Sequence, residues 1–297
     1  MKEPVSVVIT SYNRVELLRE CILQIQSQSR PCEVIVCDDG STDGSVEMVR
    51  AEFPEVVLVS NETGSPRWVV TQMDLGYRKA SHRLILSIDE DLIVPDSETV
   101  DWLCSFFEDA SVGIVAMPFV DVLRDERVQN ASKTRGQVNQ RHCHIGAGAM
   151  IDGQKYLEVG GYSLWLENYR EEAELGLKMF DAGYKVIVPP PEHVARHLRR
   201  QGGLSEVASF RSARNDVLFY WRYTPGRMWP IYVTATILRN LVDGFKERTV
   251  AARIRGLFAA LPHSLRHSIA RQPVTTQAFA KFRALKSTGP QPVEKFT

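Results

Sequence analysis

Short apolar runs alternate with amphipathic stretches along the first 118 residues of the chain. The stretches between the runs carry apolar residues at helical spacing, as at Leu18, Ile22 and Ile25. Strands that alternate with helices are typical of a doubly wound sheet. We therefore expect an α/β fold with a mostly parallel sheet. The apolar runs lie at 5–10, 33–38, 56–60, 83–89 and 112–118.

The pattern changes after residue 118. Residues 121–140 are charged and weakly periodic, which predicts a long surface loop that closes over a ligand as a lid. The small apolar run at 145–152 suits close approach of the backbone to a ligand. A helix is expected at 170–182, and the prolines after Val188 exclude a central strand beyond that point. The remainder of the chain is expected to be helical.

Composition and charge narrow the class of protein. The 297 residues are 44% apolar, which is enough for a substantial core and unlike a disordered or fibrous chain. The formal net charge is zero, yet residues 246–286 contain nine Lys or Arg and a single acid, Glu247. The five cysteines lack zinc-like spacing and the N-terminus lacks a signal-peptide pattern. We expect reduced cysteines, a cytoplasmic protein and no nucleic-acid partner.

An apolar stripe near the C-terminus has basic residues beside it. Pro262 is expected to split this stretch into two short amphipathic helices. Their apolar faces either pack on the rest of the protein or bind an anionic membrane peripherally. No uncharged stretch is long enough to span a bilayer. The stripe consists of Ile254, Leu257, Phe258 and Leu261, and the basic residues are Arg253, Arg255 and Arg266.

Polar side chains follow the first two predicted strands. Thr10 and Tyr12 end the first strand, and Asp39 follows the second. Ligands bind at the carboxyl ends of strands in an open parallel sheet, where an aromatic ring can stack on a base. The alternative is an ordinary turn that leads into a capped helix. Asn13 and Glu16 have the spacing of a capping box for the first helix.

Three adjacent acids, Asp89, Glu90 and Asp91, follow another apolar run. Their mutual repulsion at the end of a buried strand favours a hard divalent cation, Mg²⁺ or Mn²⁺, held together with substrate phosphates. An acidic turn open to water is the alternative interpretation.

A second acidic group begins the helix at 170–182. Glu171, Glu172 and Glu174 lie in its first turn, where the helix dipole alone favours negative charge. His193 and His197 follow after the next extended segment, and either could bring an imidazole toward the acids. His142 and His144 have no acidic or cysteine partner at a matching spacing, so we expect no metal site there.

The ordered set of motifs resembles the family 2 glycosyltransferases over roughly residues 4–200. The motifs are VSVVITSYNR, EVIVCDDGSTDGS, SIDEDLIVPD, IGAGAMID with VGGYS, and REEAELGLKMFDAGYKV with a later RH. The resemblance implies inverting transfer from a nucleotide sugar by an enzyme of the GT-A fold. The chain lacks the Gln-x-x-Arg-Trp motif of processive members, which favours transfer of a single sugar.

The resemblance also implies roles for individual residues. Thr10, Tyr12 and Asp39 would contact the nucleobase, and Arg67 is also placed among the residues expected to contact the donor. Asp89 would lie near the ribose. The metal ligands would be drawn from Glu90, Asp91 and His197, with His193 as the alternative histidine and the choice between the two acids left open.

The same resemblance places the general base at Glu172, next to Glu171. The family commonly has Asp at the position of Glu172, so the base here carries an extra methylene. Arg214 and Asn215 also match a pair found in short-chain sugar transferases of the family, with no role assigned.

The predicted function is therefore metal-assisted transfer of one sugar from a nucleoside-diphosphate sugar to an acceptor hydroxyl on a glycan, a lipid-linked glycan or a small molecule. A nucleotidyltransferase is the first alternative, but TSYNR stands where its Gly-rich loop would follow the first strand. A receiver-like Mg²⁺-binding signalling module is the second.

The predicted regions are a catalytic domain at 1–205 with halves at 1–118 and 119–205, a helical region at 206–286 and a disordered tail at 287–297.

Overall fold

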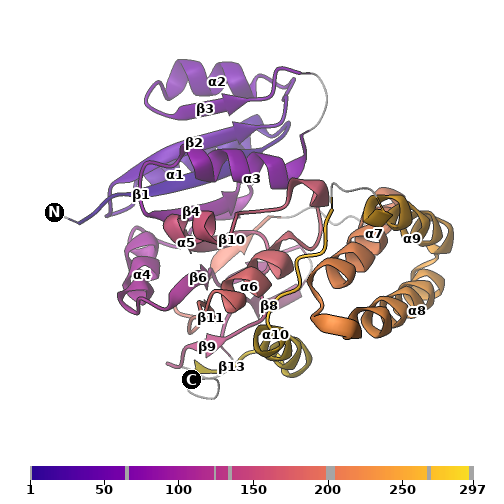
Figure 1. Cartoon of the computed structure of the whole chain (residues 1–297). Helices are drawn as coiled ribbons and strands as arrows, with labels where there is room; N and C mark the ends of the chain where they lie inside the picture. The colour runs from indigo at the N-terminus through magenta and orange to yellow at the C-terminus, as the bar shows by residue number, and fades with distance from the viewer. Residues whose placement is uncertain are drawn as a thin grey trace.

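The computed structural model describes residues 2–63, 67–123, 125–132, 136–198, 205–265 and 269–293. A nine-stranded sheet lies between two layers of helices, and a group of helices from the C-terminal part adjoins it (Figure 1). The expected α/β fold with a mostly parallel sheet and a helical C-terminal portion is confirmed. The domain boundaries stay a prediction.

The large sheet has the strand order β13-β9-β11-β6-β10-β4-β1-β2-β3. Strands β1, β2, β3 and β4 run parallel to one another, and β10 is antiparallel to both β4 and β6. The strands are β1 Val5–Ser11, β2 Cys32–Asp38, β3 Val57–Ser60, β4 Leu84–Asp89, β6 Val112–Ala116, β9 Asn139–Gln140, β10 Gly148–Asp152, β11 Lys185–Val188 and β13 Gln291–Pro292.

The helices follow the expected alternation up to α6, and the C-terminal part adds α7 to α10. Gly183, in the left-handed region with φ 86°, follows the end of α6 as expected. The helices are α1 Val15–Gln26, α2 Ser45–Glu52, α3 Trp68–Lys79, α4 Thr99–Ser105, α5 Gly153–Glu158, α6 Glu171–Asp181, α7 Glu206–Tyr223, α8 Trp229–Glu247, α9 Val250–Leu265 and α10 Thr276–Thr288.

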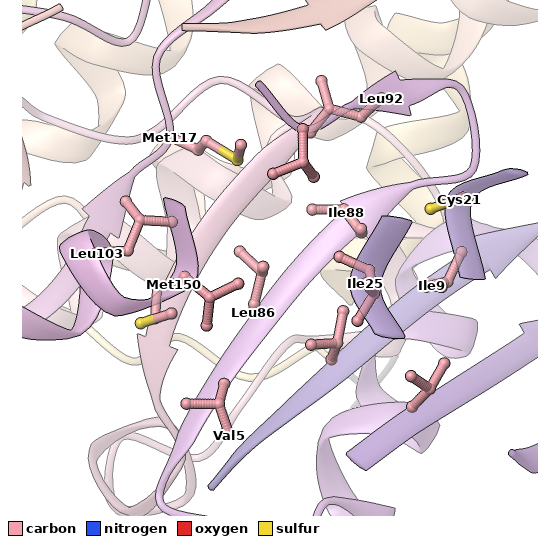
Figure 2. Close-up of a cluster of buried hydrophobic side chains, with 14 of the residues drawn as sticks. Val5, Ile9, Cys21, Ile25, Leu86, Ile88, Leu92, Leu103, Met117 and Met150 are labelled. Atoms are coloured by element: carbon pink, nitrogen blue, oxygen red, sulfur yellow. The ribbon is translucent and has the colours of Figure 1, made fainter. Parts of the chain in front are cut away.

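Both faces of the central strands are buried, because successive side chains of a strand point to opposite sides. Along β1, Val7 and Ile9 enter one apolar cluster while Val8 enters the other. Figure 2 shows the first cluster, where strand residues such as Leu86 pack against Ile25 of α1. This double burial explains why the strands read as continuous apolar runs rather than as alternating ones.

A second sheet of four short strands explains how distant segments meet. Its order is β5-β12-β7-β8, and β5 and β12 place His197 opposite Leu92. The backbone N–H of Leu198 donates to the carbonyl of Asp91 at 2.9 Å. His197 is thereby fixed beside the acidic turn. The strands are β5 Leu92–Ile93, β7 Phe119–Asp121, β8 Asp125–Gln129 and β12 Ala195–His197.

The predicted capping box at the first helix is wrong. Asn13 has a φ of 54° and lies before the N-cap residue Arg14, whose side chain makes no capping bond. Instead, the backbone N–H of Val15 donates to Oδ2 of Asp43 at 2.9 Å. A carboxylate from the neighbouring loop thus satisfies a donor that the sequence assigned to a local partner.

The segment at 121–140 is only partly a loop. Strand β8 pairs antiparallel with β7, and β9 pairs with β11 in the large sheet, so a continuous loop is wrong. Pairing to strand edges outweighs the weak periodicity of these residues. Residues 124 and 133–135 lie outside the described residues, and the lid stays a prediction.

The C-terminal part differs from expectation in two respects. Helix α9 continues past Pro262 to Leu265, so the predicted split is wrong. Its packing against α7 supports the helix, because a Cβ at Gly256 would lie 2.2 Å from the carbonyl oxygen of Phe210. Residues 291–292 pair with β9, so the tail is not disordered there. Residues 294–297 lie outside the described part.

The predicted C-terminal stripe is partly covered. Leu257 packs into a small apolar cluster, and Arg253 is buried, donating to Oδ1 of Asn240 at 2.7 Å. Ile254, Phe258 and Leu261 remain exposed. Arg266 lies outside the described residues. Within the described ranges, no helix is long and apolar enough to cross a membrane.

Candidate active site

One cavity of about 750 Å³ lies across the carboxyl ends of the central strands. The register of the sheet places Thr10 beside Asp89 on one side and beside Cys37 on the other. Parallel strands therefore end at one edge, and their polar residues converge there. Nine of the ten residues predicted for the site line this cavity. They are Thr10, Tyr12, Asp39, Asp89, Glu90, Asp91, Glu171, Glu172 and His197.

The end of the cavity near β1 and β2 is built around Asp39. Its Oδ1 accepts hydrogen bonds from Nε2 of Gln72 at 2.9 Å and from the backbone N–H of Arg67 at 2.8 Å. Arg67, the tenth predicted residue, thus meets Asp39 through its backbone and is not part of the cavity lining. Tyr12 is 54% exposed, so one face of its ring is open to a planar ligand.

The centre of the cavity holds a compact group of ligand atoms. Asp89, Asp91 and His197 offer atoms that all lie within 4.8 Å of one another. Nε2 of His197 is 3.0 Å from Oδ1 of Asp91 and 3.9 Å from Oδ2 of Asp89. Two carboxylates and an imidazole suit a divalent cation such as Mn²⁺. Asp89 joins this group, whereas the sequence placed Asp89 near the ribose and left the choice of metal ligand between Glu90 and Asp91 open.

Arg14 provides a cation at the same place. Its guanidinium donates to Oδ2 of Asp91, and its Nε lies 3.5 Å from Oε1 of Glu90. Burial, and then the charge of Asp89, raise the pKa of Glu90 to about 8. Burial also opposes ionisation of Asp91, but His197 and then Arg14 outweigh it and lower the pKa of Asp91. Asp91 is therefore the acid of this turn whose negative charge is stabilised by its neighbours His197 and Arg14.

The structure separates the two candidate histidines. Nδ1 of His193 lies 2.9 Å from Oδ2 of Asp96, and its ring lies 4.8 Å from that of Trp102. His193 is thus held away from the acidic turn, while His197 joins it. His142 and His144 line the cavity but are not part of the ligand group found among the described residues.

Glu172 of α6 lines the same cavity. Its Oε1 accepts a hydrogen bond from the backbone N–H of Gly146 at 3.1 Å. A Cβ at Gly146 would lie 2.8 Å from that oxygen, so a larger residue there would require the carboxylate of Glu172 to shift. The longer side chain of Glu, where the family commonly has Asp, therefore has a fixed position. Burial raises the pKa of Glu172 above its ordinary range.

The other two acids of α6 have different surroundings. Glu171 is buried, and no described group bonds to its Oε2. Burial, and then the charge of Glu172, raise the pKa of Glu171 well above its ordinary value. Glu174 is fully buried and accepts from the backbone N–H of Ser163 at 3.0 Å and from the hydroxyl of Tyr223. Glu174 therefore has a structural role, whereas Glu171 faces the cavity.

Three consecutive residues of α7 hold the loop that precedes α6. Nδ2 of Asn215 donates to the carbonyls of Leu166 at 2.8 Å, Asn168 at 2.8 Å and Tyr169 at 3.0 Å. Arg214 donates to the carbonyl of Trp165 at 3.1 Å. Asp216 completes the set, because it binds Arg170, the residue directly before Glu171.

Asp216 accepts from Nε of Arg170, which is the N-cap of α6. Glu167, Tyr169 and Arg170 all have positive φ, of 60°, 70° and 78°, which non-glycine residues rarely adopt. The contacts from residues 214–216 offset this backbone strain. We call residues 214–216 the loop clamp, because they fix the start of the helix that carries Glu172.

A mostly parallel sheet with an acidic cavity across its strand ends and a helical C-terminal portion is the architecture of GT-A glycosyltransferases. Residues 6–165 match the family model described as glycosyl transferase family 2. The chain belongs to this family and is a glycosyltransferase. This membership favours sugar transfer over the nucleotidyltransferase and receiver-like alternatives.

Three known proteins illustrate the similarity. An undecaprenyl-phosphate 4-deoxy-4-formamido-L-arabinose transferase of Serratia proteamaculans is 31% identical over 104 residues, which is 32% of this chain and 31% of that protein. A mannosyltransferase of Pyrobaculum calidifontis, solved with GDP-Man and Mn²⁺, superposes with a TM-score of 0.57 at 20% identity, covering 95% of this chain and 79% of that one. TarS of S. aureus, residues 1–349 with UDP-GlcNAc, gives 0.65 at 13% identity, covering 95% and 84%.

Several functional candidates were not predicted from the sequence. Arg14 and Gln72 reach the cavity from the first turn of α1 and from α3, and neither belongs to a recognisable acidic motif. Gly146 is visible only as part of a small apolar run. The pair Arg214 and Asn215 was noticed without a role, which the contacts of the loop clamp now supply.

Proposed function

We propose that this glycosyltransferase transfers one sugar from a nucleoside-diphosphate sugar to an acceptor hydroxyl with inversion at the anomeric carbon. The observation that carries the proposal is that Glu172 and the group Asp89, Asp91 and His197 line one and the same cavity. Inverting transfer needs a base on one side of the anomeric carbon and a stabilised leaving group on the other.

The nucleotide would lie at the Asp39 end of the cavity. Tyr12 offers a ring face for stacking on the base. Gln72 has a buried Oε1 without a partner in the described part of the chain, and its Nε2 is held by Asp39. That oxygen can accept a hydrogen bond from a base N–H, as buried polar atoms normally require a partner.

Asp89, Asp91 and His197 would hold a divalent cation, Mg²⁺ or Mn²⁺, with Glu90 as the alternative acid. Their donor set fits such an ion. When bound, the cation neutralises the diphosphate and stabilises it as a leaving group. Arg14 contacts Asp91 from the side of α1 and can add a second positive charge near the phosphates.

Glu172 would act as the general base. Its carboxylate takes the proton of the acceptor hydroxyl as that oxygen attacks the anomeric carbon, and the bond to the diphosphate oxygen breaks. The hydrogen bond from Gly146 leaves Oε2 of Glu172 to receive the proton. Glu171, next to it with an unpartnered oxygen, would accept a hydrogen bond from a substrate hydroxyl.

Replacing Glu172 tests this assignment. Glu172→Gln should lower kcat by roughly 10² to 10⁴, the range for a positioned carboxylate base, while affinity for the nucleotide stays unchanged. Release of nucleoside diphosphate from UDP-, GDP- and dTDP-sugars measures the reaction. Glu20→Gln, at an exposed position of α1, is the matched control. Unchanged turnover in Glu172→Gln would place the base elsewhere.

The acceptor is proposed to be lipid-linked and reached by peripheral contact with an anionic membrane. The relative from Serratia is named as an undecaprenyl-phosphate transferase. Helix α8 presents a row of exposed apolar side chains, and α9 adds two that are more than half exposed, in a segment with excess positive charge. An apolar face with basic residues beside it fits an anionic bilayer. The exposed side chains are Ile231, Leu238, Val242, Phe245, Phe258 and Leu261.

A further inference from the structure

A group of basic side chains surrounds the end of the cavity that lies beyond Glu172. Arg141, His142 and Arg170 line the cavity there. Arg283 and Lys286 of α10 stand behind them. Nζ of Lys286 lies 3.1 Å and Nη1 of Arg283 lies 3.2 Å from the hydroxyl of Tyr220, so these two cations are close neighbours. We call Arg141, Arg170, Arg283 and Lys286 the cationic wall.

The surroundings of His142 show that the cations of this wall converge. Its ring lies 5.4 Å from that of Phe282, one helical turn before Lys286. Burial, and then the charges of Arg141, Lys286 and Arg170, lower the pKa of His142 to about 3. The imidazole is therefore neutral at physiological pH, and the positive charge comes from the side chains around it.

The cationic wall holds more positive charge than its acidic partners balance. Asp216 binds Arg170 and also Arg239, whose Nη2 lies 2.8 Å away. Across the described ranges, no carboxylate lies within ion-pair distance of Arg141, Arg283 or Lys286. Burial, and then the charge of Arg170, lower the pKa of Lys286. Crowded, half-buried cations of this kind favour an anion.

Arg170 and Arg141 still have N–H groups that can donate hydrogen bonds to a ligand in the cavity. Arg170 uses Nε for Asp216, which leaves its two terminal nitrogens. With respect to the described residues, the side chain of Arg141 makes only a long bond, 3.3 Å, from Nη1 to Oδ1 of Asn130. Two guanidinium groups at one cavity wall present the planar, forked donors that bind phosphate oxygens in pairs.

From this geometry we propose that the cationic wall is a subsite for a phosphate group carried by the acceptor, placed on the side of Glu172 away from the nucleotide. The inference rests on the proposed function, since it assigns a chemical class to the acceptor of that same reaction. The phosphate would anchor the acceptor while its hydroxyl reaches Glu172. A lipid phosphate and a phosphorylated soluble saccharide share this chemistry.

Binding of methyl phosphate tests the subsite directly. The full chain is first saturated with Mg²⁺ and whichever of UDP, GDP and dTDP binds, so that the donor site is filled. Phosphorus NMR line broadening then measures the affinity for methyl phosphate. We expect saturable binding to the wild type that weakens at least about tenfold in Arg141→Gln, which loses a charge-assisted bond, and in Lys286→Gln, which loses a positive charge behind the cavity lining.

Lys281→Gln is the matched control, because this lysine is on the same helix but lies over the ring of Phe180, 5.2 Å from its centroid. Arg170 is left intact, since its loss would leave Asp216 buried without that partner. Nucleotide binding in each variant reports that the protein is folded. Equal affinity for methyl phosphate in the wild type and both wall variants, or equal weakening in Lys281→Gln, would overturn the subsite.

Two further comparisons show whether the subsite or the proposed function has failed, and which kind of acceptor carries the phosphate. If nucleotide binds but methyl phosphate does not, the subsite is wrong while the proposed function stands; if no nucleotide binds, the proposed function itself fails. Geranyl phosphate in detergent identifies the source. At least tenfold tighter binding of geranyl phosphate than of methyl phosphate supports a lipid phosphate, and equal binding supports a phosphorylated soluble acceptor.

Discussion

Glu172 is the single residue whose environment can be tested most simply by pH. Burial raises its pKa, and the charged groups that face it are Glu171, Arg170 and Asp89. A base acts only when it is deprotonated, so the rate should be full above the raised pKa and fall as pH drops through it. We expect the acidic limb of kcat to lie above the ordinary range of a glutamate.

A profile of kcat against pH, at saturating donor and acceptor, checks this expectation. Glu20→Gln should keep the wild-type profile. Glu172→Gln should lose the acidic limb together with most of the activity. A wild-type rate that stays constant down to the titration range of an exposed glutamate would contradict the assignment of a buried base.

The site residues that could be predicted are those marked by their immediate sequence neighbours. Asp39, Asp89 and Asp91 end apolar strands, and such an end in a parallel sheet faces the ligand cleft. Arg14 could not be found in this way, because its role depends on where α1 starts relative to a turn 77 residues later. The choice between Glu90 and Asp89 at the metal group likewise depends on side-chain direction within one turn.

Among the elements, the loop clamp of α7 gives the clearest prediction. Asn215→Asp keeps the shape of the side chain but places a carboxylate against three carbonyl oxygens. The loop should shift and move Glu172 with it. We expect kcat per folded enzyme to fall by up to about 100-fold, as misplacement of a catalytic group by an ångström can cause.

The measurement separates positioning from simple loss of stability. Nucleotide affinity, which depends on the Asp39 end of the cavity, should be unchanged in Asn215→Asp, while thermal unfolding should occur at a lower temperature. Glu206→Gln, exposed at the start of the same helix, is the control. A variant that loses stability but keeps the wild-type kcat and pH profile would show that Asn215 only supports the fold.

Elements with strong periodicity were predicted well, and those that depend on partners were not. Helix α6 and its end before Gly183 follow from local spacing. The pairing of β5 with β12, which brings His197 to Asp91, joins segments about a hundred residues apart and leaves no local signal. The same holds for β8 and β13, which form because neighbouring strands offer an edge.

For the molecule as a whole, the arrangement of the C-terminal helices indicates which face would contact an anionic membrane. Figure 1 shows α7, α8 and α9 grouped at one end, while α10 lies beside α6. Among the residues given for the cavity lining, none comes from α8 or α9, so the exposed apolar row of α8 lies outside the described cavity. Each basic residue near an anionic bilayer adds about 1 kcal/mol, so several together can support peripheral binding.

Flotation with anionic liposomes at low salt measures this contact. The wild type should float, and the double variant Phe245→Glu with Phe258→Glu should not, because both rings are mostly exposed at 73% and 67%. Leu157→Glu, an exposed position on α5, should still float. A wild type that stays at the bottom of the gradient would exclude the membrane contact.

Calorimetry of the wild type with UDP, GDP and dTDP, in Mn²⁺ and then in excess chelator, tests the proposed site most directly. We expect one nucleotide to bind with Mn²⁺ and its affinity to fall by roughly 10- to 1,000-fold in chelator, as contact between the diphosphate and the acids near Asp91 implies. Asp91→Ala should lose most of the Mn²⁺-dependent affinity, and Asp109→Asn, at an exposed turn, should keep it. Equal nucleotide affinity with Mn²⁺ and with chelator, or wild-type affinity in Asp91→Ala, would contradict a metal-assisted donor site at this edge of the sheet.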